Sequence, residues 1–316
     1  MTDNKFHTQD HDLYRYVYDL TVQIPEGRVS TYGALARALG DLAASRAVGR
    51  VLSADRPRPF KVPCHRVVYS DGRTGWYNGA GKGAERKQEL LRSEGVSIND
   101  GKVLNFKKTR FDDFIKDPIL EKMAAVQKEL AANVVQKGNA LAFDRISGMD
   151  VSYDGDKAFA AMVVLDRKGV VLEERVSECL VNFPYVPGYL GFREMRPYSL
   201  LLERGRKDTL YLIDGHGRAH PRRAGIASQF GVVHDVAAGG VGKSVLSGKM
   251  RTDTLYLDGE KVGRVVKGTR GKARYVSIGH KVGLDSLCQL VRSLPKDPLT
   301  MAHDLCGRVR RGEEHR

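Results

Sequence analysis

The stretch "STYGALARALGDLAASRAVGRVLSA", residues 30–54, predicts two short helices joined by a tight turn. Ser30 or Thr31 supplies a side-chain oxygen that caps the first helix, and Gly40 suits the left-handed backbone at which a helix ends. Pro57 closes the second helical run, because proline has no backbone N–H to donate. Two short helices around a glycine turn in a basic chain are typical of a helix-turn-helix.

The charge of the whole chain indicates a polyanionic partner. Its 316 residues carry a formal net charge of +14 and an isoelectric point near 9.6. Nucleic acid is the first candidate, and an acidic membrane surface is the second. No apolar run approaches the ~20 residues of a spanning helix. We therefore expect a protein that binds nucleic acid and does not bind a membrane. We also expect it to be a monomer.

The cysteines are far apart and form no CxxC pair, so neither a zinc ribbon nor a disulfide framework is expected. The start, "MTDNKFHTQDHDLY", is polar and lacks the apolar centre of a signal peptide. Both observations favour a cytoplasmic location. The four cysteines are Cys64, Cys179, Cys288 and Cys306.

A change in sequence character at residues 105–118 predicts a linker between two domains. Residues 1–104 are mostly helical in pattern and hold the helix-turn-helix. Residues 119–316 begin with an amphipathic helix and continue with apolar runs between polar turns, so an α/β domain is predicted. The predicted strands are "RISGMDVSY" (145–153), "KAFAAMVVLD" (157–166), "VVLEERVSECLVNF" (170–183), "DTLYLIDG" (208–215) and "ARYVSIG" (273–279).

The segment "VPCHRVVYSDG", residues 62–72, places a cysteine directly before a histidine and an arginine. Three roles fit this pair: a nucleophile with its base, two metal ligands, or two residues of a packed turn. An isolated cysteine is ordinarily a buried structural thiol. Here Pro63 rigidifies the approach, and His65 and Arg66 follow Cys64 at once, which favours the reactive thiolate. We expect Cys64 to be a nucleophile with a general base nearby.

Residues from about Ile24 to Val96 resemble the DNA-binding, active-site domain of O6-alkylguanine-DNA alkyltransferases. The resemblance implies a cysteine that accepts an alkyl group from O6 of guanine in one irreversible displacement. It assigns Cys64 as the nucleophile, His65 as the base that acts through water, and Glu94 as the residue that orients the histidine. The matching pieces are "IPEGRVSTYGALARALG" (24–40), "SRAVGRVL" (45–52), "PCHRV" (63–67) and "GWYNGAGKGAERKQELLRSEG" (75–95).

The same resemblance implies double-stranded DNA containing O6-alkylguanine as the partner, with the guanine flipped into a pocket. Tyr32 is then the proton donor to the departing guanine and also crowds the phosphate that must rotate. Arg46 resembles the arginine finger that fills the gap left in the helix, although an ordinary phosphate contact is its plainer role. Tyr77 and Gly79 would line the base pocket.

The chain departs from the family pattern at two points, of which the first motivates an alternative. Many relatives carry an Asn-Pro turn eight residues before the cysteine, where this chain has Arg56-Pro57. Arginine cannot accept the hydrogen bonds that an asparagine amide accepts. Only about twenty residues lie upstream of Ile24, so we do not expect the small α/β domain that usually precedes this module. The alternative is a non-catalytic lesion-binding module, against which the intact Cys64 argues.

Three acidic residues lie at or near the ends of apolar segments: Asp150 in "SGMDVSY", Glu194 in "GFREMRPY" and Asp214 in "LIDGHGRAHPRRAG". An aspartate at a strand end is ordinarily a turn residue without chemistry. Around Asp214, however, two glycines bring backbone close, and histidines and arginines crowd the loop. Acidic residues clustered within basic sequence indicate a hard divalent cation held against phosphate.

Residues from about Phe111 to Arg308 resemble endonuclease V. The resemblance implies a ribonuclease H-like fold and an enzyme that nicks DNA at the second phosphodiester 3′ to deoxyinosine. It assigns Asp150 and Asp214 to direct binding of Mg²⁺, with Mn²⁺ as the other candidate, and Glu194 and His303 to completing the shell. The motifs are "GMDVSY", "FPYVPGYLGFRE", "LIDGHGRAHPRRAGIASQFGV", "GVGKSVL", "YVSIGHKVGL" and "DPLTMAHDLC".

The endonuclease resemblance also implies a set of DNA-contacting residues. Tyr185, held between Pro184 and Pro187, resembles the family's wedge, which separates the strands. Hypoxanthine would lie in a pocket formed partly by backbone near Gly188. For His220 two roles stay open, support of the metal site or contact with the nucleic acid. Inosine in RNA is the alternative substrate, because reading a 2′-hydroxyl depends on positions that the sequence does not identify.

The segment "AAGGVGKS", residues 237–244, nearly fits a phosphate-binding loop of the GxxxxGK[ST] type. Ala237 occupies the first glycine position, and no apolar run ending in aspartate clearly follows. The endonuclease motif explains the near-match and assigns Lys243 to the substrate phosphate. We therefore expect a bifunctional DNA repair enzyme rather than an ATPase.

Overall fold

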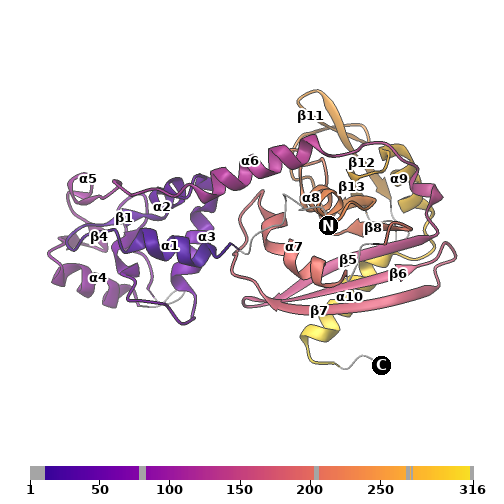
Figure 1. Ribbon diagram of the computed structural model, residues 1–316. Coiled ribbons are helices and arrows are strands. Elements are labelled where there is room, and N and C mark those ends of the chain that lie inside the picture. The colour runs from indigo at the N-terminus through magenta and orange to yellow at the C-terminus, as the bar shows by residue number, and fades with distance from the viewer. Residues whose placement is uncertain (1–10, 78–82, 203–205, 268–270, 272, 314–316) are drawn as a thin grey trace, which may run out of the picture. The chain divides into compact units, whose positions relative to one another are not determined.

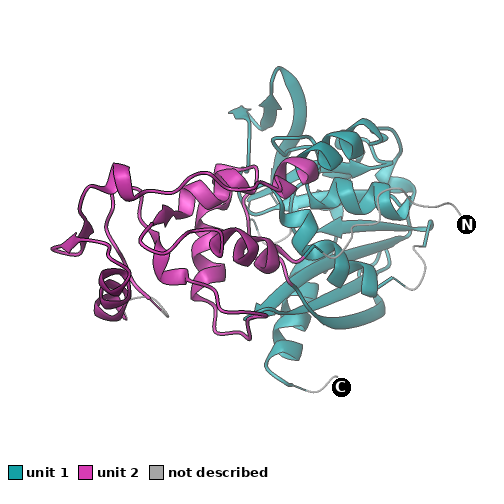
Figure 2. Cartoon of the chain, turned by 60° about the vertical axis from the view of Figure 1, so that its left-hand side comes forward, with its two compact units in different colours: residues 1–11, 124–181, 188–316 teal, residues 12–123, 182–187 magenta. Residues whose placement is uncertain are grey.

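The computed structural model describes residues 11–77, 83–202, 206–267, 271 and 273–313. Two compact units are evident (Figure 2). Residues 12–123 and 182–187 form the N-terminal unit, drawn in magenta, and residues 124–181 and 188–316 form the C-terminal unit, drawn in teal. Within the described residues, no helix is both long and apolar enough to span a bilayer.

The N-terminal unit is mostly helical, as the sequence predicts. Its two small sheets hold two strands each, and β1 pairs in parallel with β2 while β3 and β4 are antiparallel. The helices are α1 (Leu13–Thr21), α2 (Tyr32–Ala38), η1 (Leu42–Ala44), α3 (Ser45–Ser53), η2 (Cys64–Arg66), α4 (Ala84–Ser93) and α5 (Phe106–Thr109). The strands are β1 (Ser30–Thr31), β2 (Val67–Val68), β3 (Ile98–Asn99) and β4 (Lys102–Val103).

The helix-turn-helix consists of α2 and α3, which pack against each other. Thr31 is the residue that caps α2, because its Oγ1 accepts a hydrogen bond of 3.0 Å from the backbone N–H of Ala34. Gly40 ends the helix with φ of +102°, a value that L side chains rarely adopt. The second helix begins as the 3-10 turn η1 and becomes α-helical only from Ser45.

Residues 105–118 contain α5 and then an extended segment. The backbone N–H of Phe111 donates to the carbonyl of Val29 at 2.7 Å, so the start of this segment packs within the N-terminal unit. The domain limits of 1–104 and 119–316 remain a prediction.

The C-terminal unit is built on a nine-stranded mixed sheet in the order β10-β11-β12-β13-β9-β8-β5-β6-β7. β5, β6 and β7 are successive antiparallel neighbours, and β5, β8 and β9 run parallel. All five predicted strands are confirmed. The strands are β5 (Arg145–Asp154), β6 (Lys157–Leu165), β7 (Val171–Leu180), β8 (Thr209–Ile213), β9 (Ala238–Gly242), β10 (Lys249–Arg251), β11 (Thr254–Leu257), β12 (Glu260–Lys267) and β13 (Ala273–His280).

Helices cover both faces of this sheet (Figure 1). One face packs against the C-terminal half of α6 (Ile119–Ala132), α7 (Leu190–Leu200) and α8 (Ile226–His234), through a core that includes Met149, Tyr211 and Phe230. The other face packs against α9 (Leu284–Ser293) and α10 (Pro298–Arg310). This three-layer arrangement agrees with the predicted α/β, ribonuclease H-like fold.

Within the glycine-rich segment, residues 238–242 form a buried central strand, β9, and not a phosphate-binding loop. A Cβ on Gly240 would lie 2.5 Å from the backbone nitrogen of Gly217, and a Cβ on Gly242 would lie 2.7 Å from the His216 ring. The glycines are therefore needed for close approach of neighbouring backbone and side chains. Strand prediction fails here because the run carries almost no β-branched side chains.

Candidate active sites

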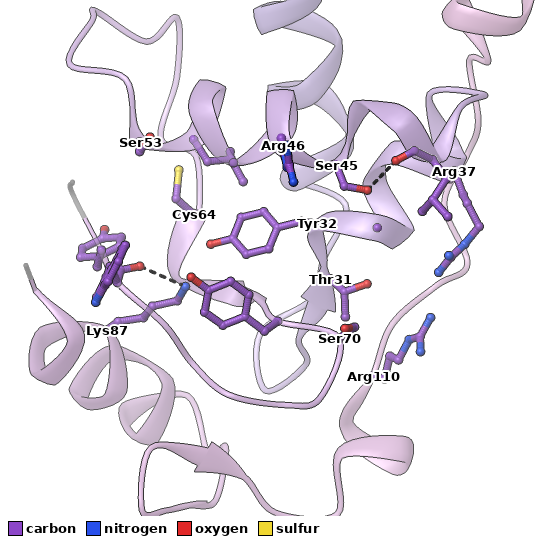
Figure 3. Close-up of a pocket in the computed structure, with 17 residues that line it drawn as sticks. Thr31, Tyr32, Arg37, Ser45, Arg46, Ser53, Cys64, Ser70, Lys87 and Arg110 are labelled. Atoms are coloured by element: carbon purple, nitrogen blue, oxygen red, sulfur yellow. Dashed lines mark hydrogen bonds between the residues drawn. The ribbon is translucent and has the colours of Figure 1, made fainter. Parts of the chain in front are cut away.

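Cys64 begins the turn η2 and lines a pocket of about 680 Å³ in the N-terminal unit (Figure 3). Only 5% of the residue is exposed. Cys64 and Lys87 lie at one end of the pocket with the Tyr32 hydroxyl turned toward them, and Arg37 and Arg110 lie at the other end. The volume lies within the ~300–1,000 Å³ range of small-molecule sites.

The thiol of Cys64 is not activated by its neighbours in the sequence. Burial raises the pKa of Cys64, and the cations Arg58 and Lys87 only partly oppose this. Arg66, which the sequence places beside the thiol, binds instead to Glu94 and to the carbonyl of Ile24. The expectation that the local cations favour the resting thiolate is therefore wrong, because desolvation is the larger effect.

Glu94 joins His65 and Arg66 in one partly buried network. Its Oε1 lies 2.8 Å from His65 Nε2 and 2.7 Å from Arg66 Nη2, and its Oε2 accepts from Arg66 Nε at 2.8 Å. Burial alone would raise the pKa of Glu94, but the hydrogen bonds from Arg66 and His65 outweigh it and hold the pKa below its usual range. Because the carboxylate can only accept, His65 Nε2 must donate, which leaves Nδ1 as the basic atom of the ring.

Tyr32 and Lys87 lie beside the thiol. Burial raises the pKa of Tyr32 to about 12, so its hydroxyl keeps its proton. The Lys87 ammonium donates to the carbonyl of Val67 at 2.6 Å and lies 6.0 Å from the centre of the Tyr32 ring. Burial lowers the pKa of Lys87 to about 8. Sequence reasoning missed Lys87, although its position four residues before Leu91 on α4 signals a lysine on the buried face.

Lys87→Met should remove a pH-dependent stability contribution. In the unfolded chain Lys87 keeps its proton up to its ordinary pKa of 10.5, whereas the folded protein releases it above about 8. The unfolded state binds more protons between these values, so this lysine makes wild-type stability rise with pH there, by roughly 3 kcal/mol. The free energy of unfolding of wild type relative to Lys87→Met should rise accordingly from pH 8 to 10.5.

The fluorescence of Trp76, the one tryptophan of the chain, reports unfolding of this unit in urea. Lys61→Met removes an exposed lysine from the same unit and should keep the wild-type pH profile. If the free energies of unfolding of wild type and Lys87→Met change with pH in parallel, the lowered pKa of Lys87 is contradicted.

Arg46 and Tyr77 also line the Cys64 pocket. Arg46 is exposed in the first turn of α3, as a residue that reaches a DNA groove requires. The Tyr77 ring stands edge-on to His65, with 6.3 Å between centroids. Gly79 lies outside the described residues. Arg56, at the departure from the family pattern, places its guanidinium 4.0 Å from the centre of the Tyr14 ring.

The second site lies where three adjacent strands carry polar residues. Asp214 directly follows β8 and Lys243 directly follows β9, and the carboxyl ends of these parallel strands meet at one edge of the sheet. Pairing of Met149 with Ile213 places Asp150 of β5 beside Asp214. The fold therefore brings together Asp150, Asp214 and Lys243, although 93 positions separate the first from the last in the sequence.

The functional side chains at this edge contact one another. Asp150 Oδ2 lies 2.6 Å from Nδ1 of His303 on α10, and Asp214 Oδ2 lies 2.5 Å from Nζ of Lys243. Glu194 comes from α7 and accepts a hydrogen bond of 3.3 Å from the hydroxyl of Tyr153. Tyr153 was not singled out in the sequence, although it lies three residues after Asp150 in the same motif.

The electrostatics of the carboxylates fit a divalent cation. Burial, and then the charge of Asp150, raise the pKa of Glu194 to about 8. Burial and the charge of Asp214 likewise raise the pKa of Asp150. Oxygen donors whose negative charges repel in a buried place are what Mg²⁺ and Mn²⁺ bind, because the cation offsets the repulsion. The residues present therefore fit the metal.

Three side chains converge on the carbonyl of Gly188. Gln127 Nε2 donates to it at 3.1 Å and Arg222 Nη2 at 2.5 Å, and His220 Nε2 lies 3.0 Å away. His220 Nδ1 accepts from the backbone N–H of Arg222, so its Nε2 carries the proton, and burial lowers the pKa of His220 to about 4. The two hydrogen bonds of His220 hold the loop at Gly188 in place. Gln127 and Arg222 bind the same carbonyl, and the sequence did not reveal this role for them.

Pro184, Tyr185 and Pro187 belong by contact to the N-terminal unit as defined above. Tyr185 is 48% exposed, Pro184 is buried and Pro187 is exposed. An exposed aromatic ring flanked by prolines agrees with a wedge, and the assignment of that role remains a prediction.

Two family models match the chain. Endonuclease V matches residues 128–303, which is more than half of the sequence. The DNA-binding domain of 6-O-methylguanine DNA methyltransferase matches residues 12–96. The fold and the two sites thus define a protein in which an alkyltransferase DNA-binding domain precedes an endonuclease V domain. Endonuclease V proteins are generally metal-dependent.

Relatives with the same two parts match along nearly the whole chain. A bifunctional methyltransferase/endonuclease of Picrophilus torridus is 35% identical over 307 residues, covering 96% of this chain and 98% of the relative. One of Thermoplasma volcanium is 34% identical over 301 residues, covering 94% and 90%. The chain therefore belongs to the family of bifunctional methyltransferase/endonucleases.

A solved structure supports the C-terminal fold. The crystal structure of endonuclease V from Streptomyces avermitilis is 34% identical to this chain, with a TM-score of 0.55. The match covers 61% of this chain and 93% of that one.

Proposed function

We propose that this protein repairs DNA at two kinds of altered purine. The N-terminal unit transfers an alkyl group from O6-alkylguanine to Cys64, and the C-terminal unit nicks DNA at the second phosphodiester 3′ to deoxyinosine. One observation carries the proposal: residues that each family resemblance assigns to a site lie close together. Cys64 and Tyr32 line one pocket. Asp150 lies beside Asp214 and His303 at one edge of the sheet.

In the alkyl transfer, the Cys64 sulfur attacks the alkyl carbon while the bond from that carbon to O6 breaks. The Glu94 carboxylate accepts from His65 Nε2, so Nδ1 is the ring atom that takes the thiol proton through water, and the carboxylate stabilises the imidazolium that results. Tyr32, whose hydroxyl keeps its proton, donates to the departing guanine. The net reaction moves the alkyl group to sulfur and the thiol proton to guanine, and the thioether is not reversed.

In the nuclease, Asp150, Asp214, Glu194 and His303 would hold Mg²⁺ or Mn²⁺. A cation bound there would stabilise the charge that develops during attack of water on the phosphodiester. Lys243 is 61% exposed and pairs with Asp214, so its ammonium is placed to bind the scissile phosphate. Tyr153 holds the Glu194 carboxylate in position.

The experiment that tests the nuclease uses a duplex with a single deoxyinosine, and Mg²⁺. Gel mapping should show one nick at the second phosphodiester on the 3′ side of the lesion. A matched strand with inosine in RNA distinguishes the alternative substrate. Random nicking, or none on either strand, would contradict the proposal.

Gln127→Met should weaken recognition of the lesion more than the chemistry. The variant keeps the side-chain volume of a fully buried residue but removes the donor to the Gly188 carbonyl and the acceptor for Arg222. Because a loop positioned by these bonds would form the base pocket, KM for the deoxyinosine duplex should rise about 10-fold with little change in kcat.

The control for Gln127→Met is Ala125→Met, which adds methionine to an exposed position on the same helix and should leave KM unchanged. A Gln127→Met enzyme with wild-type KM and wild-type selectivity for deoxyinosine would show that this network does not position the pocket.

A further inference from the structure

Cys306 lies beside the carboxylate site and has no part in the proposed Mg²⁺ chemistry. It follows His303 by three positions on α10, so the two side chains share one face of the helix. One donor atom from each of Asp150, His303 and Cys306 lies within 4.8 Å of the other two. Among the described residues, this is the one group of three such side chains found close enough to hold a metal ion.

The three donors differ in chemistry from those that a hard cation selects. Mg²⁺ takes oxygen ligands, whereas a thiolate, an imidazole and a carboxylate together are typical of zinc. Tetrahedral Zn²⁺ binds sulfur at about 2.3 Å and nitrogen or oxygen at about 2.0–2.2 Å. The donors must therefore move closer together, and the His303 side chain, which is 61% exposed, has the freedom to do so.

We propose that Asp150, His303 and Cys306 form a binding site for thiophilic divalent ions such as Zn²⁺, and that occupancy of this site inhibits the nuclease. The S–H bond of Cys306 breaks as the sulfur–metal bond forms, and the proton passes to solvent, with no change of oxidation state. Asp150 and His303 are then occupied by the thiophilic ion and cannot bind the Mg²⁺ of the proposed nuclease reaction. The inhibition, though not the binding, rests on the proposed function.

The geometry favours a specific site over scattered surface binding. Asp150 is 7% exposed and Cys306 is fully buried, while His303 opens to solvent and gives an ion its path of entry. The Cys306 thiol donates a weak hydrogen bond, of 3.2 Å, to the carbonyl of His303. A sulfur–metal bond is stronger than such a contact, so it outweighs the loss of this hydrogen bond.

Co²⁺ titration of the full-length protein tests the binding directly. Tetrahedral Co²⁺ bound to a thiolate gives a near-ultraviolet charge-transfer band, which wild type should show and Cys306→Ala should lack. Cys306→Val, which fills the buried space, guards against a loss caused by a cavity in the core. Cys288→Ala removes a buried thiol from α9 and should keep the band. No band in wild type, or a band that persists in both Cys306 variants, overturns the site.

Inhibition is measured by adding Zn²⁺ to nicking reactions that contain Mg²⁺. The zinc concentration for half-inhibition should be at least ~10-fold higher for Cys306→Val than for wild type, equivalent to about 1.4 kcal/mol of lost affinity. Equal inhibition of both enzymes overturns the proposal. A charge-transfer band from a protein that does not nick deoxyinosine DNA would leave the site standing and reject the proposed nuclease function.

Discussion

Asp150→Asn is expected to reduce the rate of nicking at deoxyinosine by at least ~10³-fold, a loss of about 4 kcal/mol of transition-state stabilisation. The residue is 7% exposed, lies beside Asp214 across the β5–β8 pairing and bonds His303. Asparagine keeps the shape but removes the negative charge that a divalent cation requires. The measurement is a single-turnover nicking assay over a range of Mg²⁺ concentrations.

The matched control is Asp154→Asn, which makes the same chemical change at the exposed end of the same strand. It should nick at the wild-type rate. Asp150→Asn should also bind the deoxyinosine duplex at least as tightly as wild type, since it loses a charge that repels phosphate. Wild-type nicking by Asp150→Asn, or full wild-type activity in the presence of a chelator, would remove the carboxylate mechanism.

Patterns local in the sequence predicted the fold well. The caps and the glycine at the ends of residues 30–40 locate α2, and the apolar runs locate β5 to β8 and β13, because each signal acts over a few residues. The strand β9 was missed for a physical reason. Its glycines are required by the close approach of Gly217 and His216, which are distant in the sequence.

The sites divide in the same way. The family motifs assign the chemistry to Cys64 and Asp150, but the groups that change the pKa values of these two residues come from other elements. The thiol is affected by Arg58 and Lys87 rather than by the adjacent Arg66. Neighbours in the sequence are therefore a poor guide to the charges that a buried group experiences, because burial and tertiary contacts decide its pKa.

The network around the Gly188 carbonyl shows the same limit. Gln127 lies on α6, 61 residues before the carbonyl that it binds, and its helix reads as an ordinary amphipathic one. A glutamine at a fully buried position is informative only when burial is known. For His220, whose role the sequence left open, the hydrogen bonds favour a role in positioning the loop at Gly188.

Cys64→Ser is expected to abolish alkyl transfer, with a loss of at least ~10⁴-fold, and to leave nicking unchanged. Displacement at a saturated carbon needs a soft, polarisable nucleophile, and a serine hydroxyl is a far weaker one, with a proton that His65 cannot remove as readily. After exposure to a duplex with O6-methylguanine, mass spectrometry should find one added methyl group on Cys64 of wild type and none on the variant.

Because Cys64 is buried, we expect its alkylation to require bound DNA, which the alkylation of an exposed thiol would not. Burial raises the pKa of Cys64, so we expect the thiolate to form only in the complex with DNA, with His65 as the proposed base. Transfer should therefore depend on duplex DNA and proceed slowly with the free base. Cys179→Ser, at a partly exposed thiol of the other unit, should transfer at the wild-type rate. Tight binding of the lesion by wild type with Cys64 unmodified would instead make the N-terminal unit a lesion-binding module.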